Sequence, residues 1–222
     1  MSDLKLLSTR LLSKQEQSQL EELGYQVDQL ASIDVELIDF EMPEELSDLV
    51  FTSQNAIRSF VNHPRSKSLE LVKLKAYCVG ERTANLAKES GFKVPYWANN
   101  SEELAQMIKE NDSDKSLVYF SGSISMRALI EGLKSDEIPY HEVVVYNTTE
   151  TQPILTKEYD MILFFSPSGV RSICANNDIS KAVKVCIGPT TAGEFKTENN
   201  LLIAEYPPSF NHMIQAIKQY KN

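Results

Sequence analysis

Short polar turns follow many apolar segments of this chain, and their residue types suit the binding of a small anion. In FFSPSG, residues 164–169, two aromatic residues are followed at once by serine, proline, serine and glycine. Helical spacing of apolar residues begins behind this turn, so the stretch predicts a strand end, a tight turn and a helix start. A helix start leaves backbone N–H groups free, and these can hold an anion. The simpler interpretation is that Ser166 or Ser168 caps the helix.

Turns of the same kind occur at the ends of other apolar segments. In an open parallel sheet such turns collect outside the carboxyl ends of the strands, where ligands bind. Backbone amides and helix dipoles there suit a carboxylate or phosphate even in a chain of net charge −9. The candidate binding residues are Arg10, Ser53, Gln54, Asn55, Gly80, Thr83, Ser121, Gly122, Ser123, Ser166, Pro167, Ser168, Gly169, Thr190 and Thr191.

Standard catalytic signatures are absent from the sequence. It contains no G-x-G-x-x-G, G-x-x-x-x-G-K-[ST], G-x-S-x-G or H-E-x-x-H. His63, His141 and His212 stand apart from one another in polar contexts, and we expect surface positions for all three. The sequence therefore favours a binding function, or a chemistry that relies on few side chains.

The composition indicates a soluble globular protein of one or two domains. Its 222 residues are 42% hydrophobic, which is enough for a substantial core. The net charge of −9 argues against a nucleic-acid partner. No run approaches the roughly 20 apolar residues of a membrane span, and the N-terminus lacks a basic region followed by an apolar one. We expect a cytoplasmic monomer in which Cys78, Cys174 and Cys186 are reduced core residues.

Short apolar segments alternate with helical patterns along most of the chain, which predicts parallel α/β sheets. The segments are almost continuously apolar, as in sheets covered on both faces. A capping box at Ser13–Glu16 begins the first predicted helix, and Gly24 ends it. The expected strands are residues 4–8, 49–52, 76–79, 94–97, 117–120, 161–165, 183–187 and 201–204.

Two pairs of segments indicate that the chain consists of two related halves. VFTSQNAIRSF, starting at Val50, matches LFFSPSGVRSI, starting at Leu163. CVGERTA, starting at Cys78, matches CIGPTTA, starting at Cys186, in the same order along the chain. A repeat of this kind predicts two α/β domains built on one plan.

Two segments between these halves mix β-branched residues with charges and do not lead into helices. They are residues 33–40 and 140–146, and we interpret 33–40 and 141–149 as linker strands. The chain would then start in one domain, cross to a second at 41–140, and return. The first domain would combine residues 1–32 with 150–222.

Several segments together resemble those of the uroporphyrinogen-III synthase family. In the family's order they are LVFTSQNAI, CVGERTANLAKESGF, VYFSGSISMRALIEGL, VVVYNTT, LFFSPSGVRSI and CIGPTTAGEF. The resemblance implies two flavodoxin-like parallel-sheet domains joined by a two-stranded linker, with the second inserted in the first. It also implies cyclisation of hydroxymethylbilane to uroporphyrinogen III, with inversion of ring D and loss of water, without metal or organic cofactor.

The resemblance also implies roles for single residues. The tyrosine of the family's V-x-x-Y element matches Tyr146, a candidate acid for the leaving hydroxyl or a donor that positions it. The alternative is that Tyr146 is an aromatic residue of the linker strand that contributes only to packing. The V-G-x-x-T element matches Gly80 and Thr83, and the G-P-T-T element matches 188–191. The acetate and propionate arms of the substrate would bind in the polar turns.

Two positions depart from the family's pattern, and two other functions fit the same turns. Leu11 stands where proline often follows the arginine, and Asn147 stands where a basic residue is frequent. One alternative is a two-lobed receptor that releases a small anion unchanged. The other is a flavodoxin-like FMN protein with residues 121–123 around the phosphate and Trp97 or a tyrosine on the flavin. The absence of flavin absorbance would exclude the FMN protein, and turnover of hydroxymethylbilane would exclude the receptor.

Overall fold

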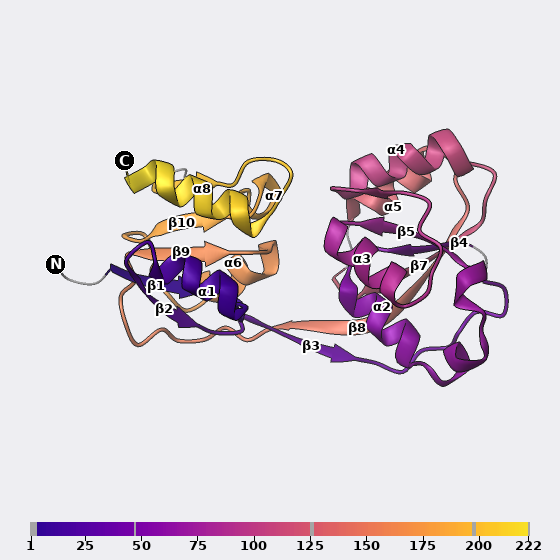
Figure 1. The fold of residues 1–222 in the computed structure, drawn as a ribbon, viewed down its shortest axis with the longest axis horizontal. Coiled ribbons are helices and arrows are strands. Elements are labelled where there is room, and N and C mark those ends of the chain that lie inside the picture. The colour runs from indigo at the N-terminus through magenta and orange to yellow at the C-terminus, as the bar shows by residue number, and fades with distance from the viewer. Residues whose placement is uncertain (1–3, 47, 125–126, 197–198, 222) are drawn as a thin grey trace. The chain divides into compact units, whose positions relative to one another are not determined.

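The chain folds into two compact α/β units. The structure, a computed structural model, describes residues 4–46, 48–124, 127–196 and 199–221 (Figure 1). Unit 1 comprises Met1–Asp34 and Thr149–Asn222, and unit 2 comprises Val35–Thr148. No helix in the described ranges is both long enough and apolar enough to cross a membrane.

Unit 1 is a five-stranded parallel sheet with helices on both faces. Its sheet has the order β11-β10-β9-β1-β2, which in chain order is the 2-1-3-4-5 arrangement of flavodoxin-like folds. Helices α1 and α8 pack on one face, and α6 and α7 pack on the other. The elements are β1 (Leu4–Ser8), α1 (Lys14–Glu21), β2 (Tyr25–Gln29), β9 (Met161–Phe164), α6 (Pro167–Cys174), β10 (Val183–Cys186), α7 (Pro189–Ala192), β11 (Leu201–Ile203) and α8 (Phe210–Lys221).

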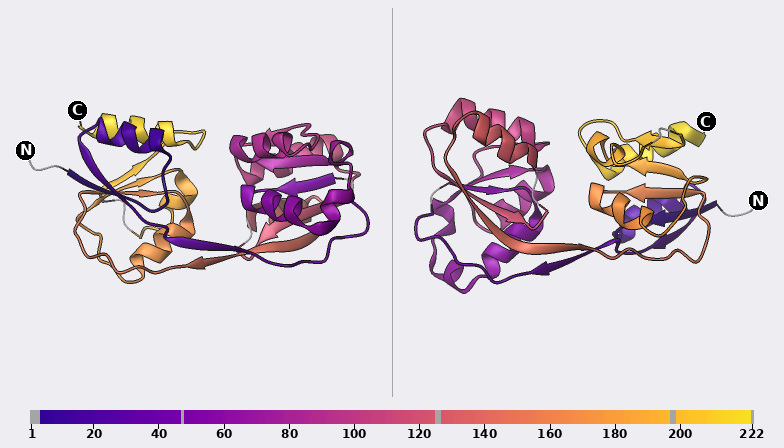
Figure 2. Two further views of the ribbon diagram at one scale, coloured as in Figure 1. Left: turned by 60° about the horizontal axis from the view of Figure 1, so that its bottom comes forward. Right: turned by 180° about the vertical axis from the view of Figure 1, so that it is seen from behind.

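Unit 2 holds a second sheet, of order β3-β8-β7-β4-β5-β6. Helices α2 and α3 cover one face, and α4 and α5 cover the other (Figure 2). The elements are β3 (Ile33–Leu37), β4 (Asp48–Phe51), α2 (Gln54–Asn62), the 3-10 helices η1 (Pro64–Ser68) and η2 (Leu71–Lys73), β5 (Lys75–Val79), α3 (Glu81–Glu89), β6 (Trp97–Ala98), α4 (Ser101–Asp112), β7 (Leu117–Gly122), α5 (Arg127–Ser135) and β8 (Tyr140–Glu150).

The chain passes between the units through β3 and β8, which lie side by side. Ile38 donates its N–H to the carbonyl oxygen of Val145 (3.2 Å), and Thr151 donates to that of Ser32 (3.1 Å). Because the paired residue numbers rise on one strand as they fall on the other, the pairing is antiparallel, as the arrows in Figure 1 also show. The other neighbouring strands in unit 2 are parallel.

The sequence repeat falls on equivalent strands of the two sheets. When β4 and β5 are matched with β9 and β10, the order β6-β5-β4-β7-β8 aligns with β11-β10-β9-β1-β2. Unit 2 therefore has the strand arrangement of unit 1 with the chain entering at a different strand, which is a circular permutation. The predicted fold class, two parallel-sheet α/β domains joined by a two-stranded linker, is confirmed.

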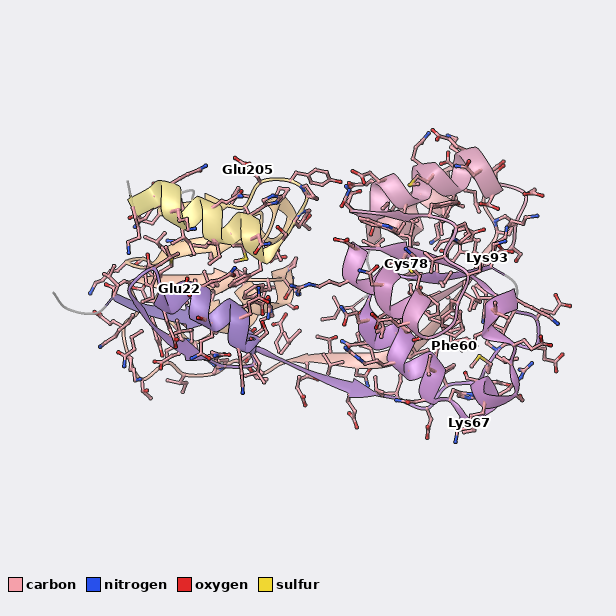
Figure 3. All side chains as sticks on the ribbon, viewed as in Figure 1. Glu22, Phe60, Lys67, Cys78, Lys93 and Glu205 are labelled. Atoms are coloured by element: carbon pink, nitrogen blue, oxygen red, sulfur yellow. The ribbon has the colours of Figure 1, made fainter. Side chains whose placement is uncertain are left out.

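The cores lie between the sheets and the helices, as the apolar strands predict. Strands β4, β7, β9 and β10 are buried along their whole length. Phe60 and Cys78, labelled in Figure 3, belong to the core between the sheet of unit 2 and helices α2 and α3. All three cysteines are free, and Cys78 and Cys186 are buried as predicted. The core position predicted for Cys174 was wrong, because this residue is exposed at the end of α6.

One predicted strand begins later in the structure, and one observed strand was not predicted. Residues 94–97 were expected to form a strand, but β6 begins only at Trp97, because Pro95 has no N–H to donate to a neighbouring strand. Strand β2, with the sequence YQVDQ, was not predicted. It lies at the edge of its sheet, where one side of the strand stays open and polar residues are tolerated.

Candidate functional site

The polar turns of unit 1 meet at the carboxyl ends of its parallel strands. Thr9, directly after β1, donates its N–H and its hydroxyl to the carbonyl oxygen of Leu163 on β9 (3.2 and 2.8 Å). A methyl group built on Gly169 would lie 3.1 Å from Ser32 Oγ and 3.6 Å from Thr9 Oγ1. The turns after β1 and β9 are thus packed together through small residues.

The turn at Ser166 is first of all a helix cap. The Ser166 hydroxyl accepts the N–H of Gly169 (3.1 Å), and the Ser166 carbonyl accepts that of Val170 (3.2 Å). Pro167 has no N–H, so within the described residues only the N–H of Ser168 at this helix start lacks a protein partner. The turn therefore presents one main-chain donor to an anion, where the sequence suggested several.

The equivalent turn of unit 2 is also closed by its own side chains. The Ser53 hydroxyl accepts the N–H of Asn55 (3.1 Å) and caps α2. Arg58 donates to the side-chain oxygens of Gln54 (2.9 Å) and Asn55 (3.2 Å). The side-chain oxygens of the three predicted residues of this turn are therefore all engaged within the turn and its helix.

The helices that begin at Gly80 and Gly188 differ, because neither start has a side-chain cap among the described residues. Gly80 has φ +85°, a conformation in which any other residue is strained. Its carbonyl accepts the N–H of Thr83, and the Thr83 hydroxyl lies 3.8 Å from where a Cβ on Gly80 would be. Thr83 and Thr191 are buried, whereas Thr190 is exposed. At these two turns no side chain caps the helix start in competition with a carboxylate.

Arg10 is held within unit 1. Its guanidinium donates to both carboxylate oxygens of Glu16 (2.7 and 3.1 Å) and to the carbonyl oxygen of Leu11 (2.8 Å). It also lies 4.1 Å from the ring centre of Phe165. The Glu16 carboxylate completes the predicted capping box with Ser13 and neutralises much of the Arg10 charge.

The third turn of unit 2, residues 121–123, is engaged with β8. Ser121 is buried and donates its hydroxyl to Glu142 Oε1 (2.7 Å). Ser123 is exposed and bonds the main chain of β8, and the ring of Tyr146 packs against Gly122. Tyr146 is half-buried, and its hydroxyl has no hydrogen-bond partner in the part of the chain that the structure describes.

The three histidines do not form a catalytic or metal-binding site among the described residues. His141 is exposed, as predicted, while His63 and His212 are half-buried. Nδ1 of His63 accepts the N–H of Arg65 (3.2 Å), and Nδ1 of His212 lies 2.6 Å from the carbonyl oxygen of Pro207. Across the described ranges, no group of three or more His, Cys, Asp or Glu residues could hold a metal ion.

A polar cluster at the opposite, amino edge of the unit 2 sheet escaped the sequence analysis. Tyr77 donates to Asp48 (2.8 Å) and Tyr96 to Asp112 (3.0 Å), and the ammonium group of Lys75 lies 3.7 and 3.4 Å from the two carboxylates. Burial and the bonded carboxylates raise the pKa of both phenols above the usual 10. The signal available was the charged residue at the start of two apolar strands, Asp48 of β4 and Lys75 of β5. Its place, away from the turns, indicates a structural role.

Removal of the Ser166 hydroxyl should weaken folding only mildly. Ser166→Ala loses the cap of α6, and we expect a loss of about 1 kcal/mol in the free energy of unfolding. Chemical denaturation should measure this against Ser135→Ala, which removes an exposed hydroxyl bonded within the end of α5. A Ser166→Ala protein as stable as Ser135→Ala would contradict the capping role.

Comparisons with known proteins agree on one family. The sequence profile described as uroporphyrinogen-III synthase HemD matches residues 14–215. A curated relative, the porphyrin biosynthesis protein HemD of Ruminiclostridium josui, is 27% identical over 187 residues, which are 76% of this chain and 37% of the relative. This chain thus spans well under half of that relative's length.

Two solved structures share the fold. A uroporphyrinogen-III synthetase from Helicobacter pylori aligns with a TM-score of 0.71 at 20% identity, over 98% of this chain and 99% of that one. A mutant uroporphyrinogen III synthase from Thermus thermophilus aligns with a TM-score of 0.65 at 14% identity, over 99% of this chain and 100% of that one. At these identities the likeness concerns the fold.

Proposed function

Because the chain belongs to the uroporphyrinogen-III synthase family, we propose that it cyclises hydroxymethylbilane to uroporphyrinogen III in tetrapyrrole (haem) biosynthesis. The observation that carries the proposal is the family match over residues 14–215. That range contains all of the candidate binding residues except Arg10, together with Tyr146. We also propose a cytoplasmic monomer without a nucleic-acid partner, in keeping with the net charge of −9.

The substrate explains why polar turns recur in both units. Hydroxymethylbilane carries acetate and propionate arms on every pyrrole, so several anion-binding turns are needed. The uncapped start at Gly80 suits a carboxylate best, since main-chain N–H groups at a helix start favour negative charge. The start at Gly188 offers less, because its helix has only 4 residues and begins with Pro189, which has no N–H. The capped turns at Ser53 and Ser166 would contribute fewer donors.

The reaction begins with loss of the substrate hydroxyl. The C–O bond of the hydroxymethyl group breaks, a proton reaches the leaving oxygen to form water, and the pyrrole becomes an azafulvene. The substituted end of ring D attacks this carbon to give a spiro intermediate, and fragmentation and reclosure invert ring D. We propose that Tyr146 supplies or positions the proton, since its hydroxyl has no partner among the described residues.

An isomer assay tests the proposal, because hydroxymethylbilane closes spontaneously only to the I isomer. We expect purified protein to give the III isomer, with full activity after exhaustive chelation. Formation of the I isomer alone at the uncatalysed rate, with hydroxymethylbilane bound, would favour the anion receptor. Flavin absorbance in the purified protein would favour the FMN protein, and activity restored by one specific metal would contradict a metal-free reaction.

A further inference from the structure

The polar groups of the turn after β7 are already bonded to the neighbouring strand. The Ser121 hydroxyl donates to Glu142 Oε1 (2.7 Å). The N–H of Ser123 donates to the carbonyl oxygen of Tyr146 (2.9 Å), and the Ser123 hydroxyl accepts the N–H of Thr148 (3.1 Å). Both bonds of Ser123 thus hold the main chain of β8 immediately around Tyr146. Of these groups, only the O–H of the exposed Ser123 is left to donate to an anion.

Gly122 provides the surface on which the Tyr146 ring lies. A Cβ on Gly122 would collide with Cε2 and Cζ of that ring and lie 2.8 Å from its hydroxyl oxygen. The backbone of Gly122 does not need positive φ, so the requirement for glycine comes from this contact. The absence of a side chain at Gly122 places the phenol end of Tyr146 at the carboxyl end of β7.

A β-bulge on β8 brings Tyr146 to this position. Ser121 pairs with Val144, but Gly122 pairs with Tyr146, so Val145 is an extra residue on β8. Its side chain is fully buried, and its carbonyl oxygen accepts the Ser59 hydroxyl (2.8 Å) and the N–H of Ile38 (3.2 Å). Bulges re-aim the side chains beside them. Here Ser59 of α2 and Ile38, directly after β3, hold the bulge in place through their hydrogen bonds to Val145.

We propose that residues 121–123 position the Tyr146 phenol, with Gly122 as the positioning residue, and do not form an anion-binding turn. This replaces the role predicted from the sequence. The catalytic role of the phenol rests on the proposed function. The position of the ring rests only on the contacts of Gly122, Ser123 and Val145. An error of about 1 Å in the position of a reacting group can cost about 100-fold in rate, so a fixed ring matters.

The test is a double-mutant cycle of Gly122→Ala and Tyr146→Phe. The new methyl group meets the far end of a side chain, so the ring should move and the melting temperature should change little. We expect kcat of Gly122→Ala to fall about as far as that of Tyr146→Phe, with KM within about threefold, and the double variant to be no slower than Tyr146→Phe. A raised KM and additive losses would mean that the turn binds substrate, and would overturn the proposal.

A second readout does not depend on activity. In protein labelled with 3-fluorotyrosine, the resonance lost in Tyr146→Phe identifies Tyr146 among the nine tyrosines. We expect this fluorine signal to shift in Gly122→Ala but not in Gly132→Ala, whose methyl would press on Ala105 Cβ at 2.7 Å instead. If the signal shifts but the protein makes no III isomer, the position of the Tyr146 ring is supported and the proposed function is contradicted. An unshifted signal in Gly122→Ala would overturn the placement itself.

Discussion

Tyr146→Phe should lower turnover of hydroxymethylbilane by about 100-fold, the lower end of the range for a positioned proton donor. Azafulvene formation is intrinsically easy in such a pyrrole, so the loss should not reach the upper end. The ring and its packing on Gly122 remain, and the hydroxyl has no partner among the described residues, so its removal leaves no buried group unsatisfied. The free energy of unfolding should therefore change little.

Turnover, isomer ratio and thermal melting should be measured together on purified Tyr146→Phe. The product should remain the III isomer, because ring inversion depends on how the protein folds the substrate. Unchanged turnover would reduce Tyr146 to a packing residue. A shift towards the I isomer would instead give Tyr146 a part in holding the folded substrate.

Lys75→Met should destabilise the protein by about 2 to 4 kcal/mol at neutral pH. The change leaves the carboxylates of Asp48 and Asp112, 8% and 11% exposed, without their shared cation. Removal of one partner of a buried ion pair typically costs about 3 to 5 kcal/mol, and we lower this figure because the Lys75 side chain is 35% exposed. The phenols of Tyr77 and Tyr96 still donate to the carboxylates, which limits the loss.

The loss should depend on pH in a defined direction. Burial acts to raise the pKa of Asp112, but the hydrogen bond from Tyr96 and the charge of Lys75 outweigh it and hold that pKa below 3.8. A lowered pKa contributes stability above pH 3.8 that is lost as the pH falls through the folded value. Because Lys75→Met raises the pKa of Asp112, the two proteins should differ most at neutral pH and converge in acid.

Urea denaturation from pH 7 to pH 3 measures this difference. Lys73→Met is the matched control, because Lys73 pairs with Glu70 on the surface, where the side chains are 70% and 67% exposed. Its unfolding free energy should change by less than about 0.5 kcal/mol. Equal effects of Lys73→Met and Lys75→Met, or a Lys75→Met loss that grows in acid, would contradict the role of the cluster.

The sequence by itself determined the fold class and the sheet edges at which the polar turns collect. Near-continuous apolar strands alternating with helices specify parallel sheets covered on both faces, since only burial on both sides tolerates such runs. The matching segments after Val50 and Leu163 revealed the two related units. These features are local in the chain, so periodicity and repetition are enough to read them. The order of strands in each sheet, and hence the circular permutation, is a matter of long-range pairing.

Only the tertiary structure decided which polar groups remain open to a ligand. In the sequence, the hydroxyls of Ser53 and Ser166 could either cap a helix or bind an anion, and in the structure each accepts an N–H of its own helix start. Ser123 is occupied by a strand 25 residues further along the chain, at Thr148. A hydrogen-bonding group can be satisfied by a partner distant in sequence, so its availability depends on the folded neighbours and not on the residue type.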